Sequence, residues 1–253
     1  MHWSLHPETL LAIGVLAGAY GVLVRDEVVL RWLLGCFAGG LALLAAAHVT
    51  PLGSLASTSL LSAHLLQNVV MAEWAPALLV LGIPAGAAAR LGRLPGARAL
   101  THPAVALALW AGTYMAWHVP AVYDAALRHQ SSLLHLEHVT YVATGLLLWW
   151  PVFQASPRRL SSGAKAAYLL AAFMVASPLG IVLSLLTEPV YDFYVAAPSV
   201  WGLSDLADQQ IAGVTMSVEE AAVFFCLGAY FLVRFMREEE SRQALDEQSS
   251  QIA

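Results

Sequence analysis

Long apolar runs alternate with short turn-forming or charged stretches along almost the whole chain. A helix rises about 1.5 Å per residue, so about 20 apolar residues cross the roughly 30 Å hydrocarbon core of a membrane. We place seven such runs at residues 8–24, 30–49, 58–83, 102–119, 134–153, 165–187 and 210–234. The pattern therefore predicts an all-α protein, a polytopic membrane bundle of seven transmembrane helices.

The composition supports this prediction. Apolar residues make up 59% of the 253 positions and charged residues only 11%, against about 25% charged residues in soluble domains. The exception is the C-terminal stretch, which is rich in Glu, Ser and Gln. We therefore expect a seven-helix domain over residues 1–236 and a disordered, acidic tail over 237–253. No basic patch typical of a nucleic-acid partner occurs.

The basic residues predict the orientation of the bundle. With seven spans, the loops alternate between two sides, and eleven of the twelve basic residues fall on one side. These eleven are Arg25, Arg31, Arg90, Arg93, Arg98, Arg158, Arg159, Lys165, Arg234, Arg237 and Arg242, while Arg128 lies on the other side. Because basic loops stay in the cytoplasm, we expect the N-terminus outside and the acidic tail inside.

Eight of the nine histidines fall toward the outer face in this orientation, and His102 is the exception. The eight are His2, His6, His48, His64, His118, His129, His135 and His138. An imidazole without a partner in hydrocarbon costs several kcal/mol, so such a cluster requires an explanation.

Four of these histidines are candidate metal ligands: His64, His118, His135 and His138. His135 and His138 are three residues apart and share one helix face, whereas Glu137 is expected to point elsewhere. His64 shares a stripe with Met71, and a set of imidazoles and a thioether suits copper. The alternative, in which each histidine only hydrogen-bonds backbone carbonyls or lipid headgroups, stays open.

Other polar residues at membrane depth form a second group of candidates. Asp208 and Glu219 return to one face of the last predicted helix, and Glu73 lies at comparable depth in the third. Intramembrane carboxylates often carry protons or bind ions. The additional ligand or proton-relay candidates are His48, Met71, Glu73, Asp124, Asp208 and Glu219. For Glu220 we expect a hydrogen bond to a neighbouring helix.

Several motifs resemble those of a known family. They are His64-Leu-Leu-Gln-Asn68, Trp117-His118-Val-Pro120, His135-Leu-Glu137-His138 and Asp208-Gln209-Gln210. With these motifs the chain resembles the cytochrome c oxidase assembly factors of the caa3-associated CtaG type, bacterial seven-helix proteins. The chain departs from that pattern in two places. Asn68 stands where the family pattern has a second histidine, and Ser217-Val218-Glu219-Glu220 replaces a Trp-Val-Pro-Gly-like run.

The resemblance and the histidine cluster together lead to one expected function. No nucleotide-binding, Rossmann or Cys-x-x-Cys motif occurs. We expect a non-enzymatic assembly factor, or chaperone, in the bacterial cytoplasmic membrane that binds copper on the outer side. Its expected partners are a haem-copper oxidase subunit or other assembly factors, within the lipid bilayer. Two alternatives stay open: a membrane redox protein that binds b-type haem through paired histidines, and a proton or metal transporter.

Overall fold

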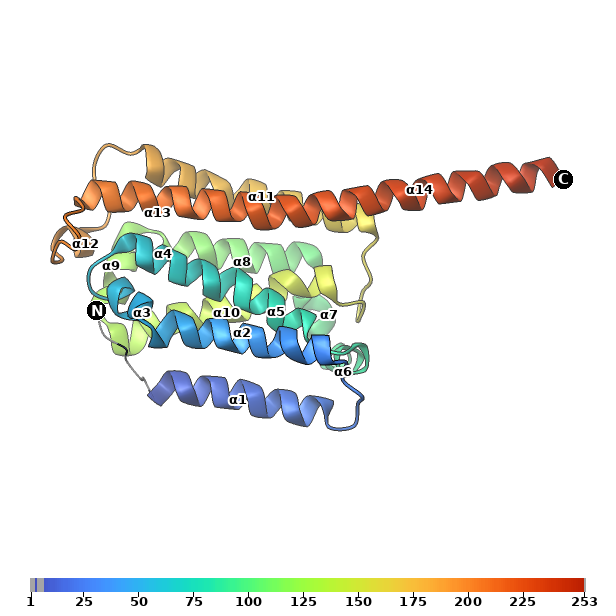
Figure 1. The fold of residues 1–253 in the computed structure, drawn as a ribbon, viewed down its shortest axis with the longest axis horizontal. Coiled ribbons are helices and arrows are strands. Elements are labelled where there is room, and N and C mark those ends of the chain that lie inside the picture. The colour runs from blue at the N-terminus through green and yellow to red at the C-terminus, as the bar shows by residue number, and fades with distance from the viewer. Residues whose placement is uncertain (1–2, 4–6, 253) are drawn as a thin grey trace.

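The computed structural model describes residues 3 and 7–252, and this part of the chain consists of helices joined by turns and loops, without a strand (Figure 1). The α-helices are α1 (Pro7–Val24), α2 (Arg31–Val49), α3 (Pro51–Ala56), α4 (Leu61–Val69), α5 (Ala75–Leu81), α6 (Ala85–Leu91), α7 (Ala97–Leu100), α8 (Pro103–Trp117), α9 (Pro120–Arg128), α10 (His135–Phe153), α11 (Ser162–Leu185), α12 (Asp192–Val195), α13 (Asp205–Glu220) and α14 (Cys226–Ile252). Three π-helical turns interrupt them: η1 (Val70–Trp74), η2 (Gln130–Leu134) and η3 (Ala221–Phe225). The all-α prediction is confirmed.

Each of the seven predicted runs forms helix. Five helical stretches of the described chain are long and apolar enough to cross a membrane, and a bent pair raises the number to six. The five are Pro7–Val24, Arg31–Val49, Leu61–Leu81, Ser162–Leu185 and Asp205–Ser250. The chain therefore has several candidate membrane spans, while the count of seven stays a prediction.

The fourth predicted span, residues 102–119, corresponds to α8, which forms a bent pair with α9 at an angle of 75°. Pro120 explains the break, because a residue before proline avoids the helical conformation. Val119 accordingly has an extended backbone, and His118 caps the end of α8. At 15 residues α8 is only about 22 Å long. The bend holds His118 at one end of the bundle.

The fifth predicted span corresponds to α10, which is not among the candidate spans of the described chain. Its length of 19 residues would suffice. However, His135, Glu137 and His138 lie in its first two turns and lower its apolar character. The candidate ligands on α10 are therefore the same residues that lower its hydropathy below that of a typical membrane span.

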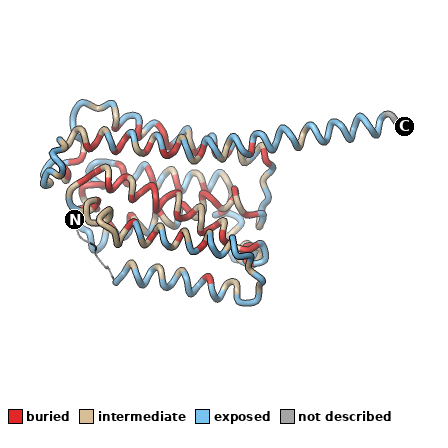
Figure 2. The backbone as a smooth tube through the Cα atoms, viewed as in Figure 1, coloured by how far each residue is buried: buried red, intermediate tan, exposed pale blue. Residues whose placement is uncertain are grey.

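The core of the bundle lies between helices distant in sequence. α13 packs on α11 and α4, α5 packs on α2, and α10 packs on α8 and α5. α11 and α13 approach most closely at glycines, since a Cβ added at Gly213 would lie 2.6 Å from the Ser184 amide nitrogen. Figure 2 shows burial concentrated in these central helices, while α1 is mostly exposed and packs beside α2.

The acidic C-terminal stretch differs from our expectation of disorder. α14 continues as one helix through Ile252 and projects away from the bundle (Figure 1). Ala, Leu, Glu, Arg and Gln in this stretch are good helix formers. Arg242 also pairs with Glu239 at 2.6 Å, one turn away. Local propensity explains the helix without tertiary packing, and residue 253 lies outside the described part.

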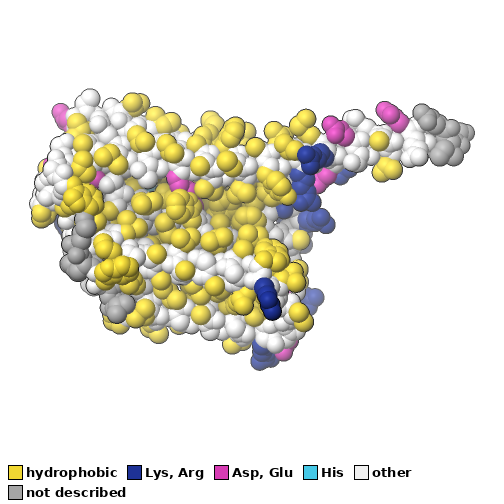
Figure 3. Space-filling model, in the orientation of Figure 1, with side chains coloured by type: hydrophobic (Ala, Val, Ile, Leu, Met, Phe, Trp, Pro, Cys, Tyr) yellow, Lys and Arg dark blue, Asp and Glu magenta, His cyan; other side chains and the backbone are white. Residues whose placement is uncertain are grey.

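Apolar side chains cover much of the visible face of the bundle, whereas Lys and Arg gather at the end from which α14 emerges (Figure 3). Exposed apolar residues occur on α1, α10, α11 and α14, for example Val15, Val139, Leu170 and Leu232. An apolar surface of this extent is typical of a protein surrounded by lipid.

Candidate metal centre and buried carboxylates

The N-terminus of α4 places His64 and is held by Asp208 of α13. The Asp208 carboxylate accepts hydrogen bonds from the Leu61 amide at 2.6 Å, the Ser62 amide at 3.2 Å and the Ser62 hydroxyl. Amide groups in the first turn of a helix lack partners within the helix, so this carboxylate caps α4 from a neighbouring element. Asp208, predicted as a second-tier ligand, has its oxygens engaged in this cap.

His64 is buried, and its hydrogen bonds determine which nitrogen carries the proton. Its Nδ1 lies 2.8 Å from the Tyr194 hydroxyl, and that hydroxyl donates its only proton to the Ala56 carbonyl. In a neutral imidazole, Nδ1 must therefore be the donor to the Tyr194 oxygen. The lone pair of His64 Nε2 is left without a hydrogen bond.

His138 repeats this arrangement through His48. The Nδ1 of His48 lies 2.9 Å from the Leu44 carbonyl, which can only accept a proton. The Nε2 of His48 is then an acceptor, and His138 Nδ1 donates to it at 3.2 Å. His138 Nε2 is buried without a hydrogen bond. The ring centroids of His138 and His64 are 6.4 Å apart.

His118 follows the same pattern at the end of α8. Its Nδ1 lies 2.7 Å from the Tyr114 carbonyl, so Nδ1 is the donor and the buried Nε2 keeps a lone pair without a hydrogen bond. The ring of Tyr123 lies 6.0 Å from that of His118 and 5.0 Å from that of His64. The buried His64 and His118 and the half-buried His138 thus each have a buried, unprotonated Nε2.

Glu137 belongs to this group, although we expected it to point away. Its side chain is fully buried, and its Oε1 lies 3.6 Å from His64 Nε2. Asn68 donates to the same oxygen at 2.9 Å, while Oε2 has no hydrogen bond. The prediction from spacing was wrong about Glu137, because it assumed that the His135–His138 face of α10 is the one that faces the core. The sequence did contain a signal. Glu137 and Tyr141 are four residues apart and so share one helix face, and both are fully buried.

His135 is separated from the buried group. Its side chain is 47% exposed and its Nε2 lies 3.6 Å from Glu8 Oε1 of α1. His135, His138 and His48 line two adjoining cavities of about 240 and 480 Å³. The larger cavity has a mostly apolar lining. Its lining also includes His48, His138 and Met71, and His48 and Met71 are two of the predicted additional candidates. His135 therefore stands at the mouth of the group.

The remaining candidates have other surroundings. Asp124 accepts a hydrogen bond from the Phe193 amide at 3.1 Å and lies 3.6 Å from Arg128, so it ties α12 to α9. His129 is exposed, and His102 caps α8 through the Ala104 amide. His2 and His6 lie outside the described residues.

A second buried group joins Glu73 of η1 to Glu219 and Glu220 at the end of α13. The three carboxylates are close enough for their charges to interact. Trp74 donates to Glu219, and the Tyr114 hydroxyl donates to Glu220 at 2.7 Å, as expected for a bond to a neighbouring helix. Neither oxygen of Glu73 has a hydrogen bond. π-helical turns adjoin both sides of this group, a feature common at functional sites.

The histidine group is not a finished metal site. Among the described residues, no three His, Cys, Asp or Glu side chains are already placed around one ion position. The donor set nevertheless fits a soft or borderline metal. Metal-binding histidines commonly fix one ring nitrogen by a hydrogen bond and leave the other for the ion. His64, His118 and His138 likewise fix Nδ1 and leave Nε2 without a hydrogen bond.

A family model described as cytochrome c oxidase caa3 assembly factor, Caa3_CtaG, matches residues 16–238. The chain belongs to this family. The match covers every helix that contributes to the histidine and carboxylate groups, so both groups lie within the region shared with other caa3 assembly factors.

Curated proteins similar to this chain come from mycobacteria. Uncharacterized proteins of Mycobacterium bovis and Mycobacterium tuberculosis are each 28% identical over 87% of this chain, and one of Mycobacterium leprae is 27% identical over the same share. The matched region is 36% of each relative, so the chain spans about a third of their length. No solved structure matches the chain.

The structure explains one departure of this family member from the pattern noted above. Asn68, which stands where a second histidine was expected, donates to Glu137 and so orients the carboxylate toward His64. An amide at this position supplies a donor instead of a further nitrogen lone pair. In this chain, Asn68 therefore contacts His64 indirectly, through Glu137.

Proposed function

We propose that this caa3 assembly factor is a non-enzymatic copper chaperone that binds the ion at the outer side of the bacterial cytoplasmic membrane and passes it to a haem-copper oxidase subunit. In this proposal seven helices cross the membrane, with α8–α9 and α10 as the fourth and fifth spans. The N-terminus lies outside, and α14 extends into the cytoplasm. Copper is the cargo, so the site has to release it as well as bind it.

The observation that carries the proposal is the tautomer shared by the buried His64 and His118 and the half-buried His138. His64, His118 and His138 each donate through Nδ1 and leave an Nε2 lone pair without a hydrogen bond. A buried polar atom without a partner costs about 1–3 kcal/mol. Three such atoms, beside an unpaired carboxylate oxygen of Glu137, are explained most simply by a cationic ligand.

The spacing of two donors supports the same conclusion. Nitrogen and oxygen ligands lie about 2.0–2.2 Å from a tetrahedral metal, which puts neighbouring ligand atoms about 3.4 Å apart. His64 Nε2 and Glu137 Oε1 are 3.6 Å apart. These two atoms can therefore contact one ion with little movement, and His118 and His138 would complete the set by side-chain rotation.

The surroundings suggest a route for the ion. His135 and Glu8 line the partly open mouth, and the cavities behind them reach His48, His138 and Met71. An exposed first ligand followed by buried ones suits transfer, because copper can move by exchange of one ligand at a time.

A copper titration of the purified chain against a competing chelator tests the proposal. Replacing His64, His118 or His138 by Ala should each weaken binding at least tenfold, since even groups that only orient ligands contribute 10- to 100-fold. His129→Ala is the matched control, because His129 is exposed and outside the group. Unchanged affinity in all three variants would remove the metal role, and a Soret band lost in them would favour haem.

A fusion test addresses the proposed orientation separately. Green fluorescent protein fused after α14 should fluoresce, because it folds in the cytoplasm, whereas alkaline phosphatase fused there should be inactive. The opposite result would place the basic end outside and contradict the positive-inside argument.

A further inference from the structure

A basic pocket lies at the opposite end of the bundle from the histidines. It has a volume of about 290 Å³ and lies between the loop before α11, the first turn of α11 and the middle of α14. Its lining includes four cationic side chains and one carboxylate, a net charge of +3. These residues are Arg159, Lys165, Arg234, Arg242 and Glu238.

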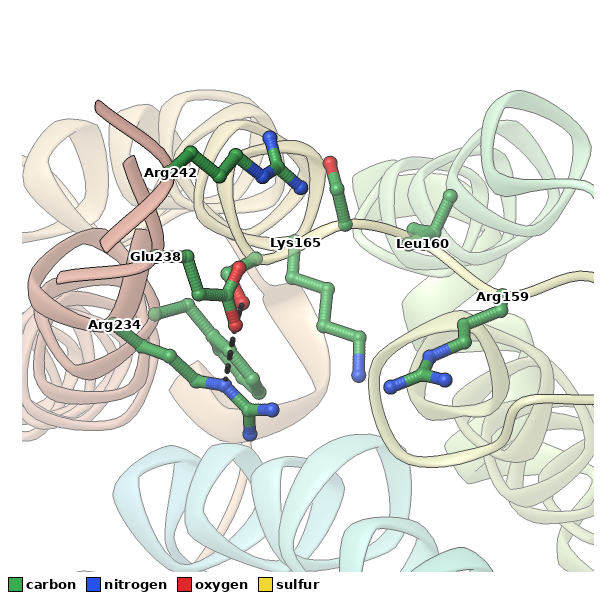
Figure 4. A pocket seen from close by; sticks show the side chains of 9 residues that line it. Arg159, Leu160, Lys165, Arg234, Glu238 and Arg242 are labelled. Atoms are coloured by element: carbon green, nitrogen blue, oxygen red, sulfur yellow. Dashed lines mark hydrogen bonds and ion pairs between the residues drawn. The ribbon is translucent and has the colours of Figure 1, made fainter. Parts of the chain in front are cut away.

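The geometry leaves two of the cations without an acidic partner. Glu238 accepts from Arg234 at 2.9 Å and from the Ser162 hydroxyl at 2.8 Å, so it is already engaged. Within the described part of the chain, Arg159 and Lys165 form no ion pair. Figure 4 shows these two side chains extending toward one another across the pocket, opposite Arg234, Glu238 and Arg242 on α14. Their positive charges repel unless an anion lies between them.

We propose that this pocket binds the phosphate of an anionic phospholipid headgroup. A phosphate diester carries one negative charge and several acceptor oxygens, and a guanidinium binds two of them at once. Arg159 and Lys165 supply the charge, while Ser161 and Ser162, at the start of the 24-residue helix α11, line the same pocket.

A second cavity favours a lipid over free phosphate. An open groove of about 490 Å³ lies along α14 alone and is lined by Cys226, Ala229, Tyr230 and Val233, together with Arg234 and Arg237. It shares Arg234 with the basic pocket. A lipid places a charged group and an acyl chain next to each other, so a basic pocket adjoining an apolar groove matches both parts of one molecule. Phe231, which lies 5.0 Å below Lys165, adds an apolar wall.

The location agrees with this assignment. The inference rests on the proposed membrane orientation, in which this end of the bundle meets the cytoplasmic leaflet. Basic pockets between helices on that side bind anionic headgroups. Anionic lipid bound here would hold α11 and α14 together where α14 leaves the bundle.

Native mass spectrometry of the full chain in detergent tests the proposal. Phosphatidylglycerol should bind about tenfold or more tightly than phosphatidylcholine, and the double variant Arg159→Gln/Lys165→Gln should lose this preference. The double variant Arg159→Lys/Lys165→Arg keeps both charges and should retain it. Arg93→Gln/Arg98→Gln is the control, because both residues are basic, exposed and outside the pocket.

Two results would overturn the proposal. Equal binding of the two lipids by the unaltered chain would show that the headgroup charge is not recognised. Displacement of phosphatidylglycerol by millimolar inorganic phosphate, with the same sensitivity to the Arg159 and Lys165 variants, would assign the pocket to a free anion. Copper binding is measured on the histidine variants, so failure of the lipid proposal is distinguishable from failure of the copper proposal.

Discussion

Asp208→Ala should lower the free energy of unfolding and misplace His64 at the same time. The substitution leaves the Leu61 amide, the Ser62 amide and the Ser62 hydroxyl without their acceptor. Each hydrogen bond to a charged group contributes about 1.5–3 kcal/mol, and water at the end of the bundle can replace part of it. We therefore expect a loss of about 3 kcal/mol, and about half of that for Asp208→Asn, which keeps one acceptor oxygen.

Reversible unfolding in mixed detergent micelles measures this loss, followed by the helical circular dichroism signal. Asp192→Ala is the matched control, because Asp192 begins a short helix at the same end of the bundle and is exposed. Copper affinity should fall with stability, because His64 lies in the first turn of α4. Unaltered stability would refute the capping role, and a loss of copper binding without a loss of stability would make Asp208 a ligand instead.

Two further predictions concern packing and the mouth of the site. Gly145→Val should destabilise the bundle by about 1–3 kcal/mol, because a Cβ at Gly145 would lie 2.7 Å from Pro76 Cγ. Thermal unfolding measures this loss. The control Gly112→Val should show no comparable effect, because nothing lies within 4 Å of a Cβ added there. His135→Ala should slow copper uptake in stopped-flow measurements while changing equilibrium affinity several-fold less than His138→Ala, and an equal loss of affinity in both variants would place His135 among the buried ligands.

Much of the fold follows from apolar run length. The predicted runs correspond to helices within a few residues because turn-forming residues such as Pro51 and Pro120 separate them. Apolar character is weaker where polar residues interrupt a helix, as in α10, or where a proline bends it, as between α8 and α9, so there the count of membrane spans stays a prediction. These are the places where the site is built, so the signal weakens where function requires polar side chains.

The site was harder to predict than the fold. Sequence spacing identified His64, His118 and His138, because polar residues at membrane depth are rare. Spacing could not establish which face of α10 meets the core. We therefore chose His135, which is exposed, and passed over Glu137, which is buried. Helix spacing relates residues within one helix, but the tautomers depend on partners such as Tyr194, which is 130 positions from His64. No local pattern contains that information.

The central claim is that His64, His118 and His138 bind copper through Nε2 together with Glu137. Anomalous X-ray scattering at the copper absorption edge, from crystals of the copper-loaded chain, tests it most directly. The account predicts an anomalous peak among these imidazoles, next to the Glu137 carboxylate, and its loss in Glu137→Ala/His64→Ala crystals. A peak confined to His135 and Glu8, or no peak in protein that retains its fold, would contradict the account.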